Sequence, residues 1–437
     1  MSAIAATTWA AEEKDSSRWM LSLISPNSTH RQAAIELMTK SWEPSYTPAL
    51  IDILRINRHP EVTHEIYYLL RENNNIDLYN DPTAWAIWSW NQPYKGDAGY
   101  VSLKGDLYSL VDQRFKAYFD PEREALIRWD EVVWGGVAQD GIPPLRDPRM
   151  IEASKAGYLE DDNVVFGIEV NGDARAYPKR ILAWHEMFTD TVGGVAVAGV
   201  YCTLCGSVIL YETEVDGTQY NLGTSGFLYR SNKLMYDRAT QSLWSTLEGK
   251  PVIGPLVGQG IELPLRSVVT TTWGEWKERH PKTKVLSIRT GHKRDYGEGV
   301  AYQDYFATDR LMFYTPSHDP RLNNKAEILA LRSPTAPEPT AISVEFLSER
   351  PVYQTKVGEQ QLLILTDGSG ANRVYGVDAD HTFSSYDGEQ LTDADGNNWS
   401  VSEDSIRGKQ TAFRRYPAHR AFWFGWQAQF PKTELIK

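Results

Sequence analysis

The sequence predicts an α+β protein in which a helical segment precedes a β-rich core of two related units. Three observations predict this fold class. Apolar residues recur at helical spacing between about residues 17 and 75. After about residue 160, short runs rich in β-branched and aromatic residues alternate with Asn-Gly and Asp-Gly turns. A tryptophan-bearing motif then recurs 150 residues later in the chain, which indicates an internal repeat.

The first segment, residues 1–80, is predicted to form short helices. Apolar positions follow helical spacing in 31–38, 48–54 and 62–70, and possible cap residues precede the first of these. Such helices joined by short turns suggest HEAT-like hairpins, and a plain helical cap on a larger domain is an equally good interpretation. Residues 81–160 are interpreted as a connecting helical and irregular region, with a further helix around 107–119.

The first β-rich unit is predicted over residues 161–330. Asn171-Gly172 and Asp216-Gly217 are expected to be hairpin turns. A strand pair interrupted by two cysteines is expected between Ala196 and Tyr211. The proline-rich stretch 331–339 is interpreted as a linker or loop, after which the second unit is predicted over 341–437.

The repeat relates these two units. Trp273, Trp276, Pro281, Lys282 and Thr283 recur as Trp423, Trp426, Pro431, Lys432 and Thr433. A looser match aligns Tyr211 with Tyr375, which places Thr366 and Ser369 opposite Cys202 and Cys205. The second unit therefore lacks the thiols, and its expected role is to buttress the first.

Composition excludes several classes of protein. The net charge of −12 argues against non-specific nucleic-acid binding. No apolar run reaches the roughly 18 residues that would span a bilayer, so no transmembrane segment is expected. The first residues show neither a basic region nor a sustained apolar run, so they give no sign of a secretory signal.

The two cysteines, Cys202 and Cys205, are the sharpest chemical motif. A Cys-x-x-Cys pair can bind one metal ion, act as a redox-active dithiol or form a structural disulfide. Thioredoxin-type dithiols open a helix, whereas the residues from Gly206 to Tyr211 are predicted to form a strand. A Cys-x-x-Cys-Gly turn between strands resembles the knuckle of zinc-ribbon sites, so metal binding is favoured.

His185 is the nearest further ligand candidate, 17 residues before Cys202. A Cys/Cys/His set with one open position suits zinc or copper, although a lone histidine can equally be a hydrogen-bonded core residue. Glu186 and Tyr201 are the candidate catalytic residues beside this metal. His419, near the second tryptophan motif, is a weaker suggestion for a fourth ligand.

Five ordered motifs carry a resemblance to a known family: Asp140-Gly141-Ile142-Pro143, Gly167 to Pro178, His185-Glu186, Tyr201 to Gly206, and Leu243-Trp244-Ser245. Together they resemble DUF3179, a bacterial and archaeal family of unknown function, over about residues 131–330. The family usually has proline where this chain has Thr203, a difference that spares both thiols. The resemblance implies that His185, Cys202 and Cys205 belong together and favours an extracytoplasmic location over a cytoplasmic one, but it implies no reaction.

The sequence thus predicts a metalloprotein with one copper or zinc ion bound by His185, Cys202 and Cys205, acting on a small molecule. A thiol–disulfide redox protein that uses the cysteine pair alone is the first alternative. A non-catalytic binding protein, with the N-terminal helices as the surface for a protein partner, is the second.

Overall fold

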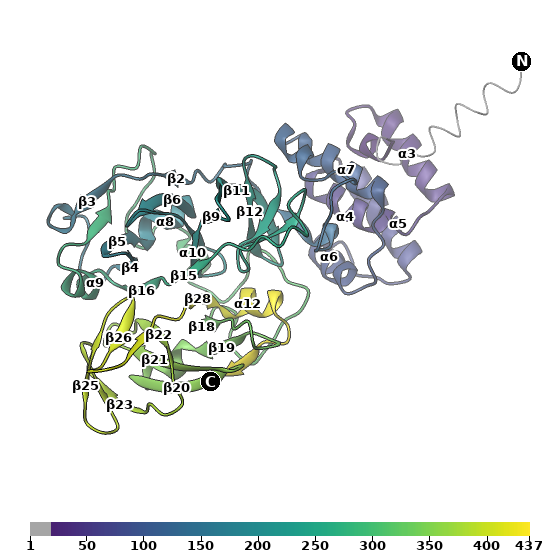
Figure 1. Ribbon diagram of the computed structural model, residues 1–437. Coiled ribbons are helices and arrows are strands. Elements are labelled where there is room, and N and C mark those ends of the chain that lie inside the picture. Colours follow the sequence, from purple (N-terminus) through teal and green to yellow (C-terminus); the bar gives the residue numbers. More distant parts are fainter. Residues whose placement is uncertain (1–18) are drawn as a thin grey trace, which may run out of the picture.

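The computed structural model describes residues 19–437. The first 18 residues of the predicted helical segment lie outside this range, and so does the part of the chain that was inspected for a secretory signal. The fold is α+β with a large β-rich part, as predicted. Helices occupy one side of the molecule, next to β11 (Leu222–Tyr229) and β12 (Asn232–Asp237), and the β-rich part forms the rest (Figure 1). The helical part contains the α-helices α3 (Ser28–Lys40), α4 (Tyr46–Ile56), α5 (Pro60–Asn74), α6 (Pro82–Trp90) and α7 (Ala98–Ser109), and the 3₁₀ helices η1 (Leu21–Ile24), η2 (Gln113–Ala117) and η3 (Trp129–Glu131).

Local capping explains where these helices begin. The side chains of Asn27, Asp81 and Asp97 accept hydrogen bonds from backbone N–H groups in the first turns of α3, α6 and α7. The helix expected around 107–119 is wrong in its bounds: α7 begins at Ala98, and Asp112 then caps the separate helix η2. Asp97 and Asp112 therefore each begin a helix, and the stretch 98–117 forms two helices.

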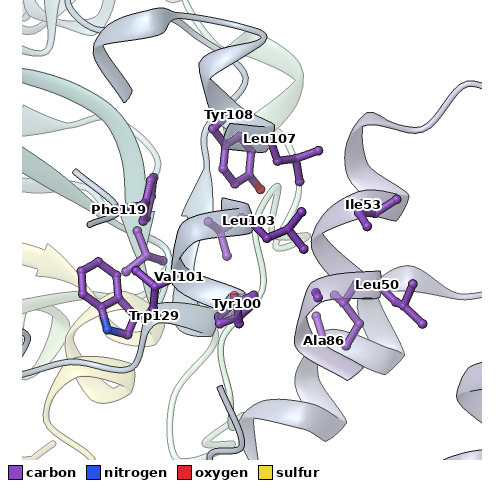
Figure 2. Close-up of a cluster of buried hydrophobic side chains, with 14 of the residues drawn as sticks. Leu50, Ile53, Ala86, Tyr100, Val101, Leu103, Leu107, Tyr108, Phe119 and Trp129 are labelled. Atoms are coloured by element: carbon purple, nitrogen blue, oxygen red, sulfur yellow. The ribbon is translucent and has the colours of Figure 1, made fainter. Parts of the chain in front are cut away.

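The helices share one hydrophobic core with the nearest sheet. Leu50 and Ile53 of α4 face Leu103 and Leu107 of α7 (Figure 2). The same cluster extends to Phe227 of β11, so the helical part is packed directly onto the β-rich part. Burial of these side chains supplies the main stabilisation of that junction.

The first β-rich unit consists of three five-stranded sheets and a small hairpin. It begins with β1 at Val132, within the stretch expected to be a connecting region, and β18 (Glu327–Leu331), expected at its end, pairs instead with strands of the second unit. The sheet orders are β1-β11-β12-β13-β14, β15-β8-β7-β6-β2 and β16-β4-β5-β17-β3, and β10 pairs with β9. The remaining bounds are β1 (Val132–Trp134), β2 (Leu145–Arg146), β3 (Met150–Glu152), η4 (Ala153–Lys155), β4 (Val164–Val170), β5 (Asp173–Pro178), α8 (Lys179–His185), β6 (Met187–Val192), β7 (Val195–Cys202), β8 (Ser207–Glu212), β9 (Glu214–Val215), β10 (Thr218–Gln219), β13 (Leu243–Ser245), β14 (Lys250–Ile253), β15 (Leu265–Arg266), β16 (Val269–Thr272), α9 (Trp273–Arg279), β17 (Lys284–Leu286) and α10 (Gln303–Phe306).

The second β-rich unit contains three further sheets, ordered β28-β18-β19-β29, β20-β21-β22 and β23-β24-β25-β26-β27. Its elements are β18 (Glu327–Leu331), β19 (Thr340–Ser343), α11 (Val344–Ser348), β20 (Val352–Val357), β21 (Gln360–Thr366), β22 (Asn372–Val377), β23 (Phe383–Tyr386), β24 (Gln390–Asp393), β25 (Asn398–Val401), β26 (Ser405–Arg407), β27 (Ala412–Arg414), β28 (His419–Phe422), α12 (Trp423–Gln429) and β29 (Glu434–Ile436). The proline-rich stretch is the loop of the β18–β19 hairpin, so it lies within this unit.

Several expected turns and strands are confirmed. Asn171-Gly172 joins β4 to β5, and Asp216-Gly217 joins β9 to β10. The cysteines lie between the antiparallel strands β7 and β8, and a strand rather than a helix follows them. No helix in residues 19–437 has both the length and the apolar character required to cross a bilayer.

A buried ionic cluster joins the two β-rich units. Arg373 of β22, fully buried, contacts Asp367 at 2.6 Å, Glu403 at 2.7 Å and Glu275 of α9 at 3.0 Å. Glu275 and Glu403 have further partners in Arg279 and Arg415. The three carboxylates are thus matched by three guanidinium groups at the junction.

Candidate functional site

The cysteine turn is held between two strands of the first unit. Cys202 is the last residue of β7 and pairs with Ser207 at the start of β8. The N–H of Cys205 donates to the carbonyl of Cys202 at 3.1 Å, and Gly206 has a φ of 58°, which a glycine adopts without strain. The two cysteines form a disulfide, and each is at most 3% exposed.

Cys202 lies on the wall of a small cavity of about 90 Å³. The wall is mainly apolar, and Leu204, Phe227 and Phe313 contribute to it. It also contains two charged side chains, Glu186 and Lys233, together with Cys202, Thr224 and Tyr302. Cys205 is not part of the wall, since its Sγ lies 3.1 Å from the carbonyl oxygen of Ser231.

Glu186 and Lys233 form a buried ion pair in this cavity. Each side chain is 6% exposed, and the ammonium contacts Oε2 of the carboxylate. Burial lowers the pKa of Lys233, and the charge of Glu186 opposes that effect. Glu186 ends α8 with a φ of 56°, and its carbonyl accepts the N–H of Tyr201 at 2.9 Å. The reversal of the chain at this point places Glu186 beside the end of β7.

A long segment between β17 and β18, residues 287–326, covers the site and is called the strap below. Three of its tyrosines donate hydrogen bonds to residues of the site: Tyr305 to the carbonyl of Leu204 at 2.7 Å, Tyr302 to Glu186 at 3.4 Å and Tyr296 to His185 at 2.6 Å. The Ser231 hydroxyl also donates to the carbonyl of Phe313 in the strap at 2.8 Å. The strap is therefore attached to the site at four points.

The structure places His185 next to the site but uses both of its ring nitrogens. Nδ1 donates to the carbonyl of Pro143 at 2.8 Å, which leaves Nε2 to accept the hydroxyl of Tyr296. Burial lowers the pKa of His185 to about 4, so the ring is neutral at pH 7. As arranged, the lone pair that a metal would need is engaged by Tyr296.

The metal-ligand set predicted from the sequence is not assembled in this arrangement. Within residues 19–437, no three side chains of histidine, cysteine, aspartate or glutamate converge as a metal site. The sulfurs of Cys202 and Cys205 are bonded to each other, and the His419 ring packs against Trp426 in the second unit. The copper or zinc site stays a prediction.

The two predicted catalytic residues are placed differently. Glu186 is in the cavity wall beside Cys202. Tyr201 packs on Phe166 with ring centroids 4.9 Å apart, on the opposite face of β7 from Cys202 because neighbouring residues of a strand alternate. Burial raises the pKa of Tyr201, so it is a neutral phenol at pH 7. Its placement is that of a core residue.

Lys233, Tyr302 and Ser231 were not identified from the sequence. Of these three, Lys233 could have been noticed in the sequence, because it lies within the strand run Asn232-Lys233-Leu234-Met235-Tyr236. Every residue of that run is buried. A lysine in a fully buried strand needs a partner of opposite charge. Tyr302 and Ser231 carry no comparable pattern.

The second unit covers the cysteine turn. The N–H of Phe422 donates to the carbonyl of Cys205 at 2.7 Å, and Asn232 donates to the carbonyl of Gly425 at 2.8 Å. A Cβ at Gly206 would lie 2.7 Å from the Phe422 ring. The turn is thus fixed from both sides.

Replacing Gly206 is expected to loosen this contact. Gly206→Ala adds the cost of a left-handed alanine, about 1–2 kcal/mol, and a clash with Phe422 of about 1–3 kcal/mol. Gly217→Ala is the matched control, because its φ is 75° and no atom lies within 4 Å of the added Cβ. Urea unfolding of both variants checks the prediction; equal losses of stability would contradict it.

Comparison with known proteins places this site in a family. The family model described as "Protein of unknown function (DUF3179)" matches residues 139–433, more than half of the chain. The match extends through the second β-rich unit, beyond the range of about residues 131–330 that contains the motifs. No curated protein and no solved structure matches the chain. The chain therefore belongs to the DUF3179 family.

Proposed function

We propose that this protein is a thiol–disulfide redox protein whose Cys202–Cys205 pair exchanges electrons with a small thiol or disulfide. The observation that carries the proposal is the disulfide on the wall of a small cavity whose wall also contains the buried pair of Glu186 and Lys233. A cation beside a thiol favours its thiolate form, which is the reactive species.

The disulfide is poorly suited to a purely structural role. It closes a loop of only four residues, for which the chain-entropy relation gives about 2 kcal/mol, well below the value for a long loop. Both cysteines are almost fully buried, so a partner reaches the pair through the cavity. Because the cavity measures only about 90 Å³, we expect a small reagent to reach Cys202 more readily than the surface of a folded protein.

The exchange begins at Cys202, because Cys202 and not Cys205 faces the cavity. A small thiolate attacks Sγ of Cys202, the bond between the two cysteines breaks, and Cys205 leaves as a thiolate that takes up a proton. A second small thiolate then attacks the sulfur that the first small thiol contributed to the mixed disulfide. A small disulfide is released, and Cys202 leaves as a thiolate that takes up a proton. The net change oxidises two small thiols and reduces one protein disulfide.

Thiol titration in redox buffers tests the proposal. We expect the native protein to be reduced by 2-mercaptoethanol much faster than by reduced thioredoxin, which is too large for the cavity. Cys202→Ser and Cys205→Ser each abolish the two-electron exchange. A native protein that resists 2-mercaptoethanol but is reduced once unfolded in guanidinium, or one reduced equally fast by both reagents, contradicts the proposal.

The metal prediction is tested on the same protein. A copper or zinc ion on His185, Cys202 and Cys205 requires a reduced pair and a Tyr296 hydroxyl displaced from Nε2. Near-stoichiometric zinc or copper in protein purified without tag or chelator, lost in Cys202→Ser, would replace the redox proposal. Absence of both metal and exchange would leave the non-catalytic binding protein.

The two β-rich units are interpreted as copies, with the second supporting the first. One sheet of each unit supports this interpretation. Its strands are ordered β16-β4-β5-β17 in the first unit and β28-β18-β19-β29 in the second, and corresponding neighbours pair in the same direction, parallel or antiparallel. The indole N–H donates to a threonine hydroxyl at 2.9 Å in both, Trp276 to Thr283 and Trp426 to Thr433. Thr366 ends β21 as Cys202 ends β7, which supports the alignment of the two turns.

Two further interpretations accompany the redox proposal. A HEAT-like arrangement of the N-terminal helices, with a protein partner on their exposed faces, stays a prediction. An extracytoplasmic location is favoured, since a disulfide persists most readily in an oxidising compartment.

A further inference from the structure

A second cleft, separate from the cysteine site, lies at the junction of the two β-rich units. Its volume is about 600 Å³, in the range of small-molecule sites and larger than the cavity beside Cys202. Lys250 and Glu262 of the first unit line one side. Arg332, Tyr416 and Phe430 of the second unit line the other.

The charges in this cleft leave one cation without a carboxylate. Glu262 pairs with Lys250 at 3.0 Å, and Glu338, also in the wall, has Lys432 at 4.0 Å. Within residues 19–437, Arg332 has no carboxylate within 4.0 Å, and its Nε is buried with no hydrogen-bond partner. Its Nη1 has only a long 3.5 Å contact with the carbonyl of Glu248. Arg332 lines the cleft, and an arginine without a carboxylate partner in a cleft wall is a binding group for an anion.

The surroundings hold Arg332 ready for such an anion. The hydroxyl of Tyr416 donates to the carbonyl of Arg332 at 2.6 Å, and the loop that follows contains Pro334, Pro337 and Pro339, which restrict its backbone. His419 is buried behind this region, and within the described chain neither of its ring nitrogens has a partner. Burial and then the charge of Arg332 lower the pKa of His419 to about 3, so its ring is neutral at pH 7.

We propose that this cleft binds a small molecule that carries an oxyanion, carboxylate or phosphate, on an aromatic or apolar body. The anion would contact the guanidinium of Arg332 in the two-pronged geometry that arginine offers to such groups. The body would lie against Phe430 and the proline loop, which form the apolar part of the wall. This inference does not depend on the redox proposal, because none of its residues lines the cavity beside Cys202.

Calorimetric titration of the full-length protein with four probes tests the proposal. Phenylacetate and phenyl phosphate carry both features, inorganic phosphate carries only the anion, and benzyl alcohol carries only the ring. We expect phenylacetate or phenyl phosphate to bind at least tenfold more tightly than benzyl alcohol, and the stronger of the two identifies the anion. Binding of neither, or equal binding of benzyl alcohol, overturns the proposal.

Variants locate the binding in the cleft. Arg332→Met is expected to weaken binding of the tighter-binding probe at least tenfold. Arg332→Lys keeps the charge but not the two-pronged geometry, so it is expected to weaken this binding by less. Arg310→Met is the matched control, because Arg310 is an exposed arginine in a different pocket. Cys202→Ser is expected to bind the probe as the wild type does. Unchanged binding by a folded Arg332→Met, checked by circular dichroism, overturns the proposal.

Discussion

Arg373→Met is expected to lower the free energy of unfolding at pH 7 by about 3–5 kcal/mol, because it removes one partner from a fully buried ionic cluster. Asp367 would lose the one guanidinium contact that it has within residues 19–437, at 2.6 Å, and keep the Ser369 hydroxyl, which donates to its other oxygen at 2.6 Å. Glu403 would keep Arg415 at 2.9 Å, and Glu275 would keep Arg279 at 2.8 Å. The uncompensated charge therefore falls mainly on Asp367.

The loss should depend on pH with a defined sign. Burial alone would raise the pKa of Asp367, but Arg373 holds that pKa below its ordinary value. Burial would also raise the pKa of Glu403, but Arg373 and Arg415 hold it well below the ordinary range. In the wild type these carboxylates contribute stability above a pH of about 4, which is lost as the pH falls through their folded pKa values. In Arg373→Met, burial without the cation raises the pKa of Asp367, so the folded variant takes up a proton. The difference between the two proteins should shrink as the pH falls from 7 toward 4.

Urea unfolding at pH 7 and pH 5 measures both effects. Arg238→Met is the matched control, since Arg238 pairs with Asp140 but is 46% exposed, and exposed pairs contribute about 0–1 kcal/mol. A loss in Arg373→Met as small as that in the control would contradict the assignment of this cluster as the link between the two units. So would a loss that grows as the pH falls.

The sequence was most informative where structure is local. The turns at Asn171-Gly172 and Asp216-Gly217 were predictable because both need left-handed residues at their centre, and Asn171 and Gly172 have φ values of 51° and 81°. The strand after Cys205 was predictable from its run of β-branched and apolar residues. The bounds of α7 were not, since the choice among several acidic residues as caps depends on how the helices pack.

The composition of the site was predictable only in part, for reasons of geometry. The spacing of His185 and Cys202 reflects a real proximity, because Glu186 and Tyr201 are bridged by a backbone hydrogen bond at the end of the β6–β7 hairpin. Spacing does not reveal where an imidazole points, and the partner that engages Nε2 lies 111 residues away on the strap. Lys233 likewise reaches Glu186 only through the packing of two sheets.

Lys233→Met is expected to lower the free energy of unfolding by about 3–5 kcal/mol, because it leaves the carboxylate of Glu186 buried without its cation. Glu186→Gln combined with Lys233→Met removes both charges and should recover most of that loss, since a neutral pair carries no uncompensated charge. Urea unfolding of the two single variants and the double variant measures the coupling. Additive losses would contradict a direct interaction of the two side chains.

The double variant also separates the redox role of Lys233 from its structural role. If the ammonium favours the thiolate of Cys202, its removal raises the thiol pKa, and each unit of that rise lowers the thiolate fraction at pH 7 about tenfold. Glu186→Gln alone keeps the ammonium, so comparing it with the double variant isolates the effect of the cation. The reduced double variant should react at least about tenfold more slowly than Glu186→Gln with a small disulfide such as oxidised 2-mercaptoethanol. Asp52→Asn combined with Lys104→Met is the matched control, because it neutralises a buried pair in the helical part, 2.8 Å apart, whose two residues are not in the wall of the cavity beside Cys202. Slower exchange in the double variant than in Glu186→Gln, with the rate of the control unchanged, assigns the lysine to the thiol chemistry. Equal rates in Glu186→Gln and the double variant would leave Lys233 as a structural partner of Glu186 only.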